Sequence, residues 1–184
     1  AGYLLDLLLG DPEWLYHPVR LIGKYISFAE KRLRTRGGNL RKSAVLLTVS
    51  TVLLTMAAAP LILFRLRLAR QIPLFIGMAL MNWMGIAVTC MAKEARDVEK
   101  SFDRGIYAAR NQVARFVGGD PGRLDEEEIV KAAVETVAEN TTDGVISPLF
   151  WALLGGPGLL WGFQAANTLD SMVGYMDEKY RDIG

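Results

Sequence analysis

The sequence predicts an all-α, multi-pass integral membrane protein, and two observations carry this prediction. The first is the segregation of charge: 51% of the 184 residues are hydrophobic and 22% are charged, yet residues 43–64, 71–92 and 144–169 contain no Asp, Glu, Lys or Arg. The second is the length of these stretches, since roughly 20 apolar helical residues cross a hydrocarbon core of about 30 Å. The single cysteine, Cys90, excludes a disulfide scaffold.

The first two charge-free stretches each predict a transmembrane helix. Residues 44–64 and 72–92 are separated by a short basic connection, so we expect an antiparallel helical hairpin. Ten Lys and Arg residues flank the outer ends of the hairpin and three lie in the connection, which places the outer ends in the cytoplasm and the protein in the cytoplasmic (inner) membrane. The inverted orientation stays open because the connection is itself basic. Cys90 is expected to pack inside the second helix.

The third charge-free stretch differs from the other two because residues 155–158, Gly-Gly-Pro-Gly, interrupt it. A continuous helix does not tolerate this run well, and each half alone is too short to cross a bilayer. The alternatives are one kinked span or a re-entrant hairpin of two half-helices, whose irregular backbone must be buried in protein or line a wet cavity. We favour the re-entrant form because it returns Asp170 to the side of the membrane that holds Asp143.

Charged stretches alternate with the apolar ones. Apolar positions spaced three or four apart predict an amphipathic cytosolic helix over 92–117, and the turn residues at 118–122 end it. Asp125, followed three residues later by Glu128, predicts a capping box at the start of a second cytosolic helix. No internal repeat divides the chain, so we predict one membrane-embedded domain over 1–184. Its parts are an N-terminal motif with a basic flank (1–42), the hairpin (43–92), cytosolic helices (93–143) and the broken segment with a polar motif (144–184).

A first group of candidate catalytic residues ends the second cytosolic helix. Glu135 and Glu139 lie four residues apart on one face, and Asn140 and Asp143 extend the polar group. Carboxylates at this spacing supply the hard oxygen ligands that Mg²⁺ prefers, or position a proton. The alternative is a solvated face on which Lys131 relieves the repulsion between the two glutamates.

A second polar group follows the broken segment, where hydrocarbon should end. Asn167, Asp170 and Ser171 share one helical face at i, i+3 and i+4. An ionisable residue at this depth is a functional candidate by default, and the alternative is the capping of a helix end at the interface. If the segment is re-entrant, the two polar groups converge at one membrane face.

The N-terminal stretch contains the only histidine, His17, next to Pro18. A lone histidine is usually structural, but Asp11 and Arg20 flank this one, and a guanidinium beside a carboxylate-rich site suits a phosphate group. No Gly-rich phosphate loop is present. The basic run at 31–42 abuts a membrane helix, so it indicates topology or lipid contact, and we expect no nucleic-acid partner.

Three runs of the sequence resemble the CobD/CbiB family of cobalamin biosynthesis, adenosylcobinamide-phosphate synthase. They are DLLLGDPEWLYHPVRLIG at 6–23, AAVETVAENTTDGVISPLFWALLGG at 132–156 and NTLDSMVGYMDEKY at 167–180. The resemblance implies an inner-membrane enzyme that uses ATP and Mg²⁺ to join aminopropanol, or its phosphate, to a carboxylate of adenosylcobyric acid. It also implies contacts with the lipid bilayer and with a second copy or other cobalamin-assembly membrane enzymes. Family members are longer, which implies a further C-terminal portion.

The implied chemistry suggests a role for each candidate. Amide formation from a carboxylate requires activation, such as an acyl phosphate, with a metal ion and cations that neutralise phosphate charge. We expect Glu135, Glu139 and Asp143 to bind Mg²⁺ or orient the amine, and Asp170 to share the metal or act as a base. The expected substrate-binding residues are His17, Arg20, Asn140, Asn167 and Ser171. The alternatives from other classes are a non-catalytic, AmpE-like membrane sensor or scaffold and a small transporter.

Overall fold

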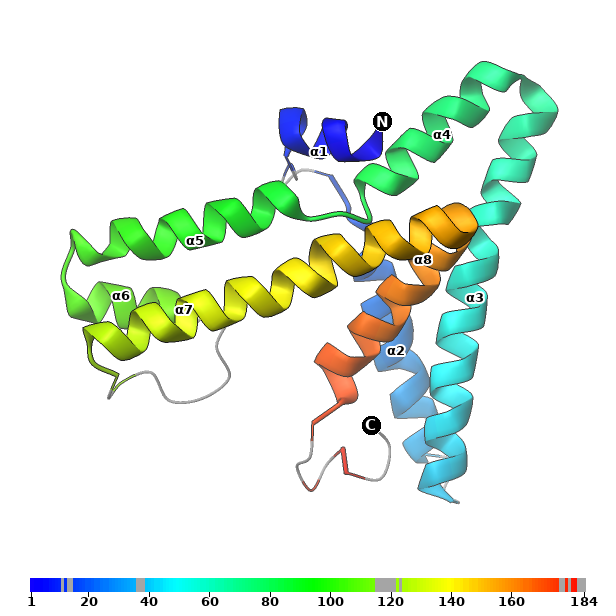
Figure 1. Ribbon diagram of the computed structural model, residues 1–184. Helices are drawn as coiled ribbons and strands as arrows, with labels where there is room; N and C mark the ends of the chain where they lie inside the picture. Colours follow the sequence, from blue (N-terminus) through cyan, green and yellow to red (C-terminus); the bar gives the residue numbers. More distant parts are fainter. Residues whose placement is uncertain are drawn as a thin grey trace.

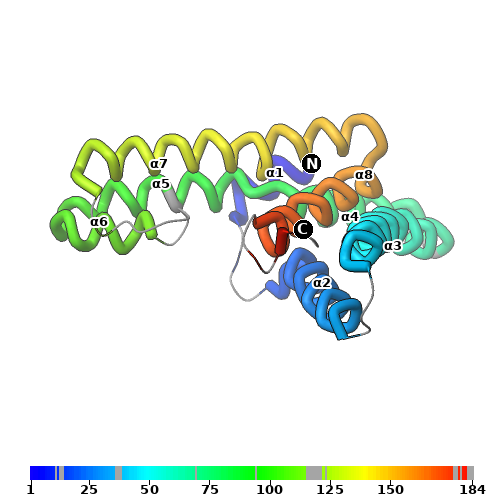
Figure 2. Tube along the Cα trace, turned by 90° about the horizontal axis from the view of Figure 1, so that it is seen from below, coloured from blue at the N-terminus to red at the C-terminus, as the bar shows by residue number. Residues whose placement is uncertain are grey.

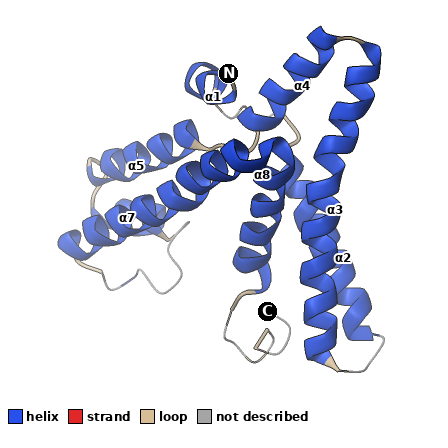
Figure 3. Cartoon of the chain, turned by 45° about the vertical axis from the view of Figure 1, so that its right-hand side comes forward, coloured by secondary structure: helices blue, strands red, loops and turns tan. Residues whose placement is uncertain are grey.

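The computed structural model describes residues 1–10, 12, 15–35, 39–114, 122, 124–175, 178 and 180–181. Every long regular element in these ranges is helical (Figure 3), which confirms the all-α class. The elements are α1 (Gly2–Leu9), α2 (Pro18–Thr35), α3 (Leu40–Ala69), α4 (Gln71–Trp83), α5 (Val88–Phe102), α6 (Ile106–Val113), α7 (Glu126–Thr141), the π-helix η2 (Thr142–Ile146) and α8 (Ser147–Val173). Three helical stretches are long and apolar enough to cross a membrane: Leu40–Leu68, Gln71–Phe102 and Glu126–Val173.

The helices form two groups that share the long stretch from α7 to α8 (Figures 1 and 2). In one group α2, α3 and the later part of α8 pack around a core that includes Leu47 and Leu160. In the other group α5, α6 and α7 lie side by side around Val113 and Ile129. Many large apolar side chains of α3 and α4 stay exposed, as expected of helices that face lipid.

The predicted pairing of the first two apolar stretches is confirmed, since α3 packs against α4. The side chain of Asn39 caps α3 by accepting a hydrogen bond from the Lys42 N–H at 3.2 Å. Gly77 of α4 faces Leu63 and Leu66 of α3, where a Cβ would collide with a leucine side chain. This small residue therefore permits the close approach of the two helices.

The second apolar stretch is not one continuous helix, and this corrects the prediction. A turn over 84–87, which we call the α4–α5 turn, separates α4 from α5. Groups distant in the sequence satisfy its backbone: Gln164 Nε2 donates to the Gly85 carbonyl at 2.8 Å, and the Ala87 N–H donates to the Gly144 carbonyl at 3.0 Å. Irregular backbone in apolar surroundings is stable when protein groups provide its hydrogen bonds.

The predicted amphipathic helix over 92–117 is also wrong in its continuity. The chain turns after α5, and α6 begins after Gly105, whose φ of 96° lies in the left-handed region that favours glycine. Residues 115–117 of the predicted helix and most of the predicted turn at 118–122 lie outside the described residues.

The start of α7 confirms the predicted capping box. Asp125 Oδ1 accepts a hydrogen bond from the Glu128 N–H at 2.9 Å, and Glu128 Oε2 accepts one from the Asp125 N–H at 2.9 Å. At its other end α7 passes without interruption into η2 and α8 (Figure 1).

The predicted break in the third apolar stretch is confirmed. Gly155 and Gly156 leave the helical conformation, and Gly156 has a φ of 64°. The chain reverses its direction here (Figure 1), so that 147–154 continue α7 while 157–173 return toward α2 and α3. The stretch before the bend is not a separate half-helix, because it continues the helix that begins at Glu126, and this corrects the expectation of two short halves.

Hydrogen bonds tie α1 to the ends of α4 and α5. Trp83 Nε1 donates to the Gly10 carbonyl at 3.0 Å. Asp6 is only 1% exposed, and its Oδ2 accepts hydrogen bonds from the Thr89 N–H at 3.0 Å and from Thr89 Oγ1 at 3.2 Å. The carboxylate thus satisfies an orphan donor in the first turn of α5.

Replacing Asp6 by Ala should lower the free energy of unfolding by about 1–3 kcal/mol, because a backbone donor at Thr89 loses its acceptor. The change is measured by chemical unfolding in detergent micelles. Asp103→Ala removes an exposed acid and serves as the control, with an expected effect under about 0.5 kcal/mol. Equal stabilities of the two variants would contradict the role assigned to Asp6 as the acceptor for the Thr89 N–H.

Candidate functional site

The α4–α5 turn holds together three parts of the chain that are distant in sequence. Besides the bonds to Gln164 and Gly144, Trp161 Nε1 of α8 donates to the Met81 carbonyl at 3.2 Å, just before the turn. Just after it, Thr89 binds α1. The N-terminal segment, η2 and the returning half of α8 therefore meet around this turn.

A cavity of about 220 Å³ lies beside the first turns of α2 and α5. We call it the basic cavity, and its lining residues are Pro12, Leu15, His17, Arg20, Thr89, Cys90 and Lys93. The sequence predicted His17 and Arg20 as substrate-binding residues, and the structure brings both to one cavity. Thr89 and Lys93 were missed, although Lys93 is the first charged residue after the second apolar stretch. Cys90 was expected only to pack, and it is half-buried at the cavity wall.

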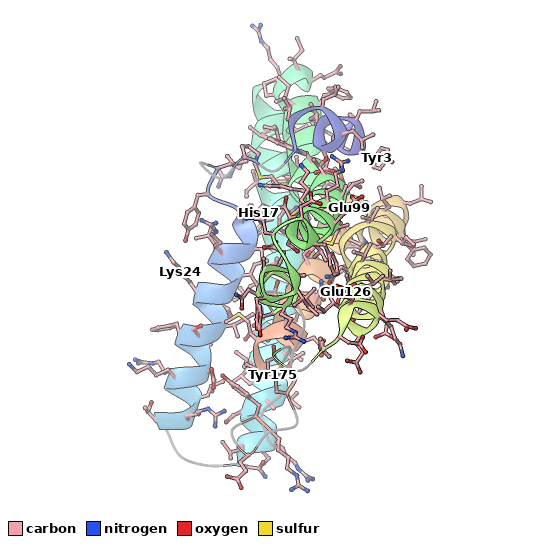
Figure 4. All side chains as sticks on the ribbon, turned by 90° about the vertical axis from the view of Figure 1, so that its left-hand side faces the viewer. Tyr3, His17, Lys24, Glu99, Glu126 and Tyr175 are labelled. Atoms are coloured by element: carbon pink, nitrogen blue, oxygen red, sulfur yellow. The ribbon has the colours of Figure 1, made fainter. Side chains whose placement is uncertain are left out.

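The position of His17 is set by the start of α2 (Figure 4). Its Nδ1 accepts a hydrogen bond from the Val19 N–H at 3.2 Å, so the ring caps the helix. A neutral imidazole that accepts at Nδ1 carries its proton on Nε2, which is then a donor. The centre of the ring lies 6.4 Å from that of Trp161, which connects the cavity wall to α8. Asp11, the predicted acidic neighbour, lies outside the described residues.

On α7, Glu135 and Glu139 are exposed and Asn140 is half-buried. Lys131 Nζ lies 3.9 Å from Glu135 Oε1, with both side chains largely exposed. Lys131 is therefore close enough to reduce the repulsion between Glu135 and Glu139, as the alternative expected. An ion pair as exposed as Lys131 and Glu135 contributes little to stability. Glu139 keeps its exposed position one turn further along, towards η2.

Asp143 lies half-buried in η2. Short π-helical segments inside α-helices are frequent at functional sites, because the extra residue in the turn redirects side chains. The bond from Ala87 to the Gly144 carbonyl fixes this segment against the α4–α5 turn. Within the first polar group, Asp143 is thus the acid that lies beside the α4–α5 turn. The basic cavity lies just after this turn, at the start of α5.

The second polar group lies in the last turns of α8. Asn167 is half-buried, whereas Asp170 and Ser171 are exposed. Ser171 Oγ donates to the Asn167 carbonyl at 3.0 Å, and the Gly174 N–H donates to the Asp170 carbonyl at 2.9 Å. The carboxylate of Asp170 therefore lies at the end of the helix that leaves the bend.

The two polar groups do not form one metal-binding cluster in the described part of the chain. There α7 packs on α5 and α6, and the returning half of α8 packs on α2 and α3. Within the described residues, no three His, Cys, Asp or Glu side chains come close enough to share a metal ion. The expected convergence is therefore not seen at metal-binding distances.

Comparisons with known proteins agree on one family. The profile described as CobD/Cbib protein matches residues 1–184. The chain is 46% identical to the cobalamin biosynthesis protein CobD of Listeria monocytogenes, over 100% of this chain and 59% of the relative. It is 44% identical to the cobalamin biosynthesis protein CobD of Pelobacter propionicus, over 98% of this chain and 56% of the relative. It is 38% identical to the cobalamin biosynthesis protein CbiB of Salmonella arizonae, over 100% of this chain and 59% of the relative. No solved structure matches the chain.

These relatives are longer than the chain, which spans between 56% and 59% of the length of the three named above. All three runs of sequence on which the resemblance rests fall inside the matched region. Parts of the first two runs meet at or near the α4–α5 turn, through Asp6 and Gly144. The third run begins three residues after Gln164, which donates to the Gly85 carbonyl of this turn.

Proposed function

Because the chain belongs to the CobD/CbiB family, we propose that the protein acts in cobalamin biosynthesis as an amide-forming synthase. Its reaction joins aminopropanol or aminopropanol phosphate to a carboxylate of adenosylcobyric acid. The observation that supports this most is that two of the family-like segments, through Asp6 and Gly144, meet beside the α4–α5 turn, with the cations Arg20 and Lys93 in the adjacent cavity. The protein would act as a multi-pass enzyme of the cytoplasmic membrane with its active face in the cytosol.

Amide formation requires the carboxylate to become a better electrophile. Transfer of a phosphoryl group from ATP to the substrate carboxylate yields an acyl phosphate and ADP, and attack by the amine then forms the amide and releases phosphate. The amine must lose a proton during attack, and a carboxylate such as Asp170 or Glu139 is a suitable acceptor. Asn140, Asn167 and Ser171 would orient substrate groups through hydrogen bonds.

The donor set also fits a magnesium ion that arrives with phosphate. Mg²⁺ usually keeps several waters and binds one or two protein carboxylates together with substrate phosphates, so it does not require a cluster of three acids. Glu139 and Asp143 lie one turn apart where α7 passes into η2, and these two acids would hold such an ion, whereas Glu135 lies a further turn back beside Lys131. The ion would neutralise phosphate charge during transfer.

Vitamin production in a bacterium that lacks its own CobD/CbiB-family gene tests the proposal. Full-length wild-type protein should restore growth on cobyric acid under conditions that require cobalamin. Cobinamide, which lies beyond the proposed step, should restore growth without the protein and shows that later steps are intact. A membrane sensor, scaffold or transporter would leave growth on cobyric acid unrestored, and that result would contradict the proposed function. Equal growth with Glu139→Gln would instead exclude Glu139 from the proposed site.

A further inference from the structure

We propose that the basic cavity binds a terminal phosphate group, the one carried by a phosphorylated amine or by a nucleotide. The choice of these two ligands rests on the proposed function, whereas the phosphate chemistry rests on the cavity itself. Its described lining combines a guanidinium, an ammonium and an imidazole, and contains no carboxylate. Such a lining selects an anion.

The two cations come from different helices. Arg20 lies in the first turn of α2 and Lys93 in the second turn of α5, and both are exposed enough to reach a ligand. A guanidinium binds two phosphate oxygens at once, whereas an ammonium acts as a compact point charge. Both positive charges attract a terminal phosphate, and the Nε2–H of His17 supplies a further donor.

The cavity is large enough for a phosphate group but too small to enclose the corrin ring of adenosylcobyric acid. Its volume of about 220 Å³ is below the roughly 300–1,000 Å³ of pockets that enclose drug-sized ligands. It suits a phosphate with a few attached atoms. The remainder of a larger ligand would extend out of the cavity.

The backbone contributes less than the side chains. The positive ends of α2 and α5 both adjoin the cavity, and helix starts attract anions. However, the buried carboxylate of Asp6 already accepts the Thr89 N–H in the first turn of α5, and it opposes a second anion there. Most of the attraction must therefore come from Arg20 and Lys93.

Isothermal titration with the full-length protein in nanodiscs of phosphatidylcholine tests this inference, because that lipid has no terminal phosphate. The probes are aminopropanol phosphate, unphosphorylated aminopropanol and ATP without Mg²⁺. Arg20→Gln and Lys93→Gln should each weaken binding of the preferred phosphate probe by roughly tenfold or more, since each loses a charge-assisted contact. Arg32→Gln on α2 and Lys100→Gln on α5, whose side chains are exposed away from the cavity, should bind as the wild type does.

The outcomes are distinct. Tight binding of aminopropanol phosphate identifies the phosphorylated amine, and tight binding of ATP identifies the nucleotide, with the same sensitivity to Arg20→Gln in either case. Equal affinity for the amine with and without phosphate, together with no binding of ATP, overturns the inference, as does binding that Arg20→Gln and Lys93→Gln leave unchanged. Phosphate binding without amide formation would instead refute the proposed function alone.

Discussion

Replacing Glu139 by Gln is expected to lower the rate of amide formation by roughly 100-fold or more, the usual scale for loss of a group that transfers a proton or holds a catalytic ion. Glutamine keeps the shape of the side chain but removes its charge. Glu139 is exposed on α7, so the substitution leaves no cavity or buried polar atom, and the fold should be intact. The loss is measured as product formed per amount of protein in membranes.

Asp170→Asn should produce a loss of similar size, because this carboxylate at the end of α8 is proposed to share the metal ion or to act as the base. Glu127→Gln is the matched control: it removes an exposed acid in the first turn of α7, remote from the proposed site, and should retain the wild-type rate. Wild-type rates from both Glu139→Gln and Asp170→Asn would show that the assigned acids do not take part.

Leu160→Ala should lower the free energy of unfolding by about 2–5 kcal/mol, the range for removal of a large side chain from a packed core. Leu160 is 0% exposed in the core between α2, α3 and α8, and its side chain also lies against Gly85 of the α4–α5 turn. The cavity left by alanine would loosen the contact between α8 and that turn. Chemical unfolding in detergent micelles measures the effect.

The same substitution at Leu153 is the control within the same helix. Leu153 precedes the bend and is 86% exposed, so Leu153→Ala should change the free energy of unfolding by less than about 1 kcal/mol. Equal destabilisation by the two variants would mean that the half-helix after the bend is not packed as described.

Elements governed by local signals could be predicted from the sequence. Charge-free length marked α3, the glycines at 155–156 marked the reversal in α8, and the Asp125 and Glu128 pair marked the start of α7. Each signal acts within a few residues, so no knowledge of the partner helices was needed. The α4–α5 turn was missed because the groups that satisfy it, Gln164 and Gly144, lie 79 and 57 positions away from their partners.

Only part of the candidate site could be predicted, because the sequence pattern relates residues that are close together in the chain and not those that the fold brings together. His17 and Arg20 lie three positions apart in the chain, so their combination indicates a phosphate contact from the sequence alone. Lys93 joins them only because Asp6 and Trp83 hold α1 against the start of α5. The separation of the two polar groups depends on the directions in which the two halves of α8 leave the bend. Spacing along the sequence does not define these directions.

The most direct test of the proposed function is the conversion of adenosylcobyric acid and aminopropanol phosphate to adenosylcobinamide phosphate by membranes that contain the full-length protein. The reaction should require ATP and Mg²⁺, and the product should vanish with Glu139→Gln. Unphosphorylated aminopropanol, assayed in parallel, identifies the accepted amine. If well-folded wild-type protein forms no product from either amine with ATP and Mg²⁺ present, the protein is not the proposed synthase.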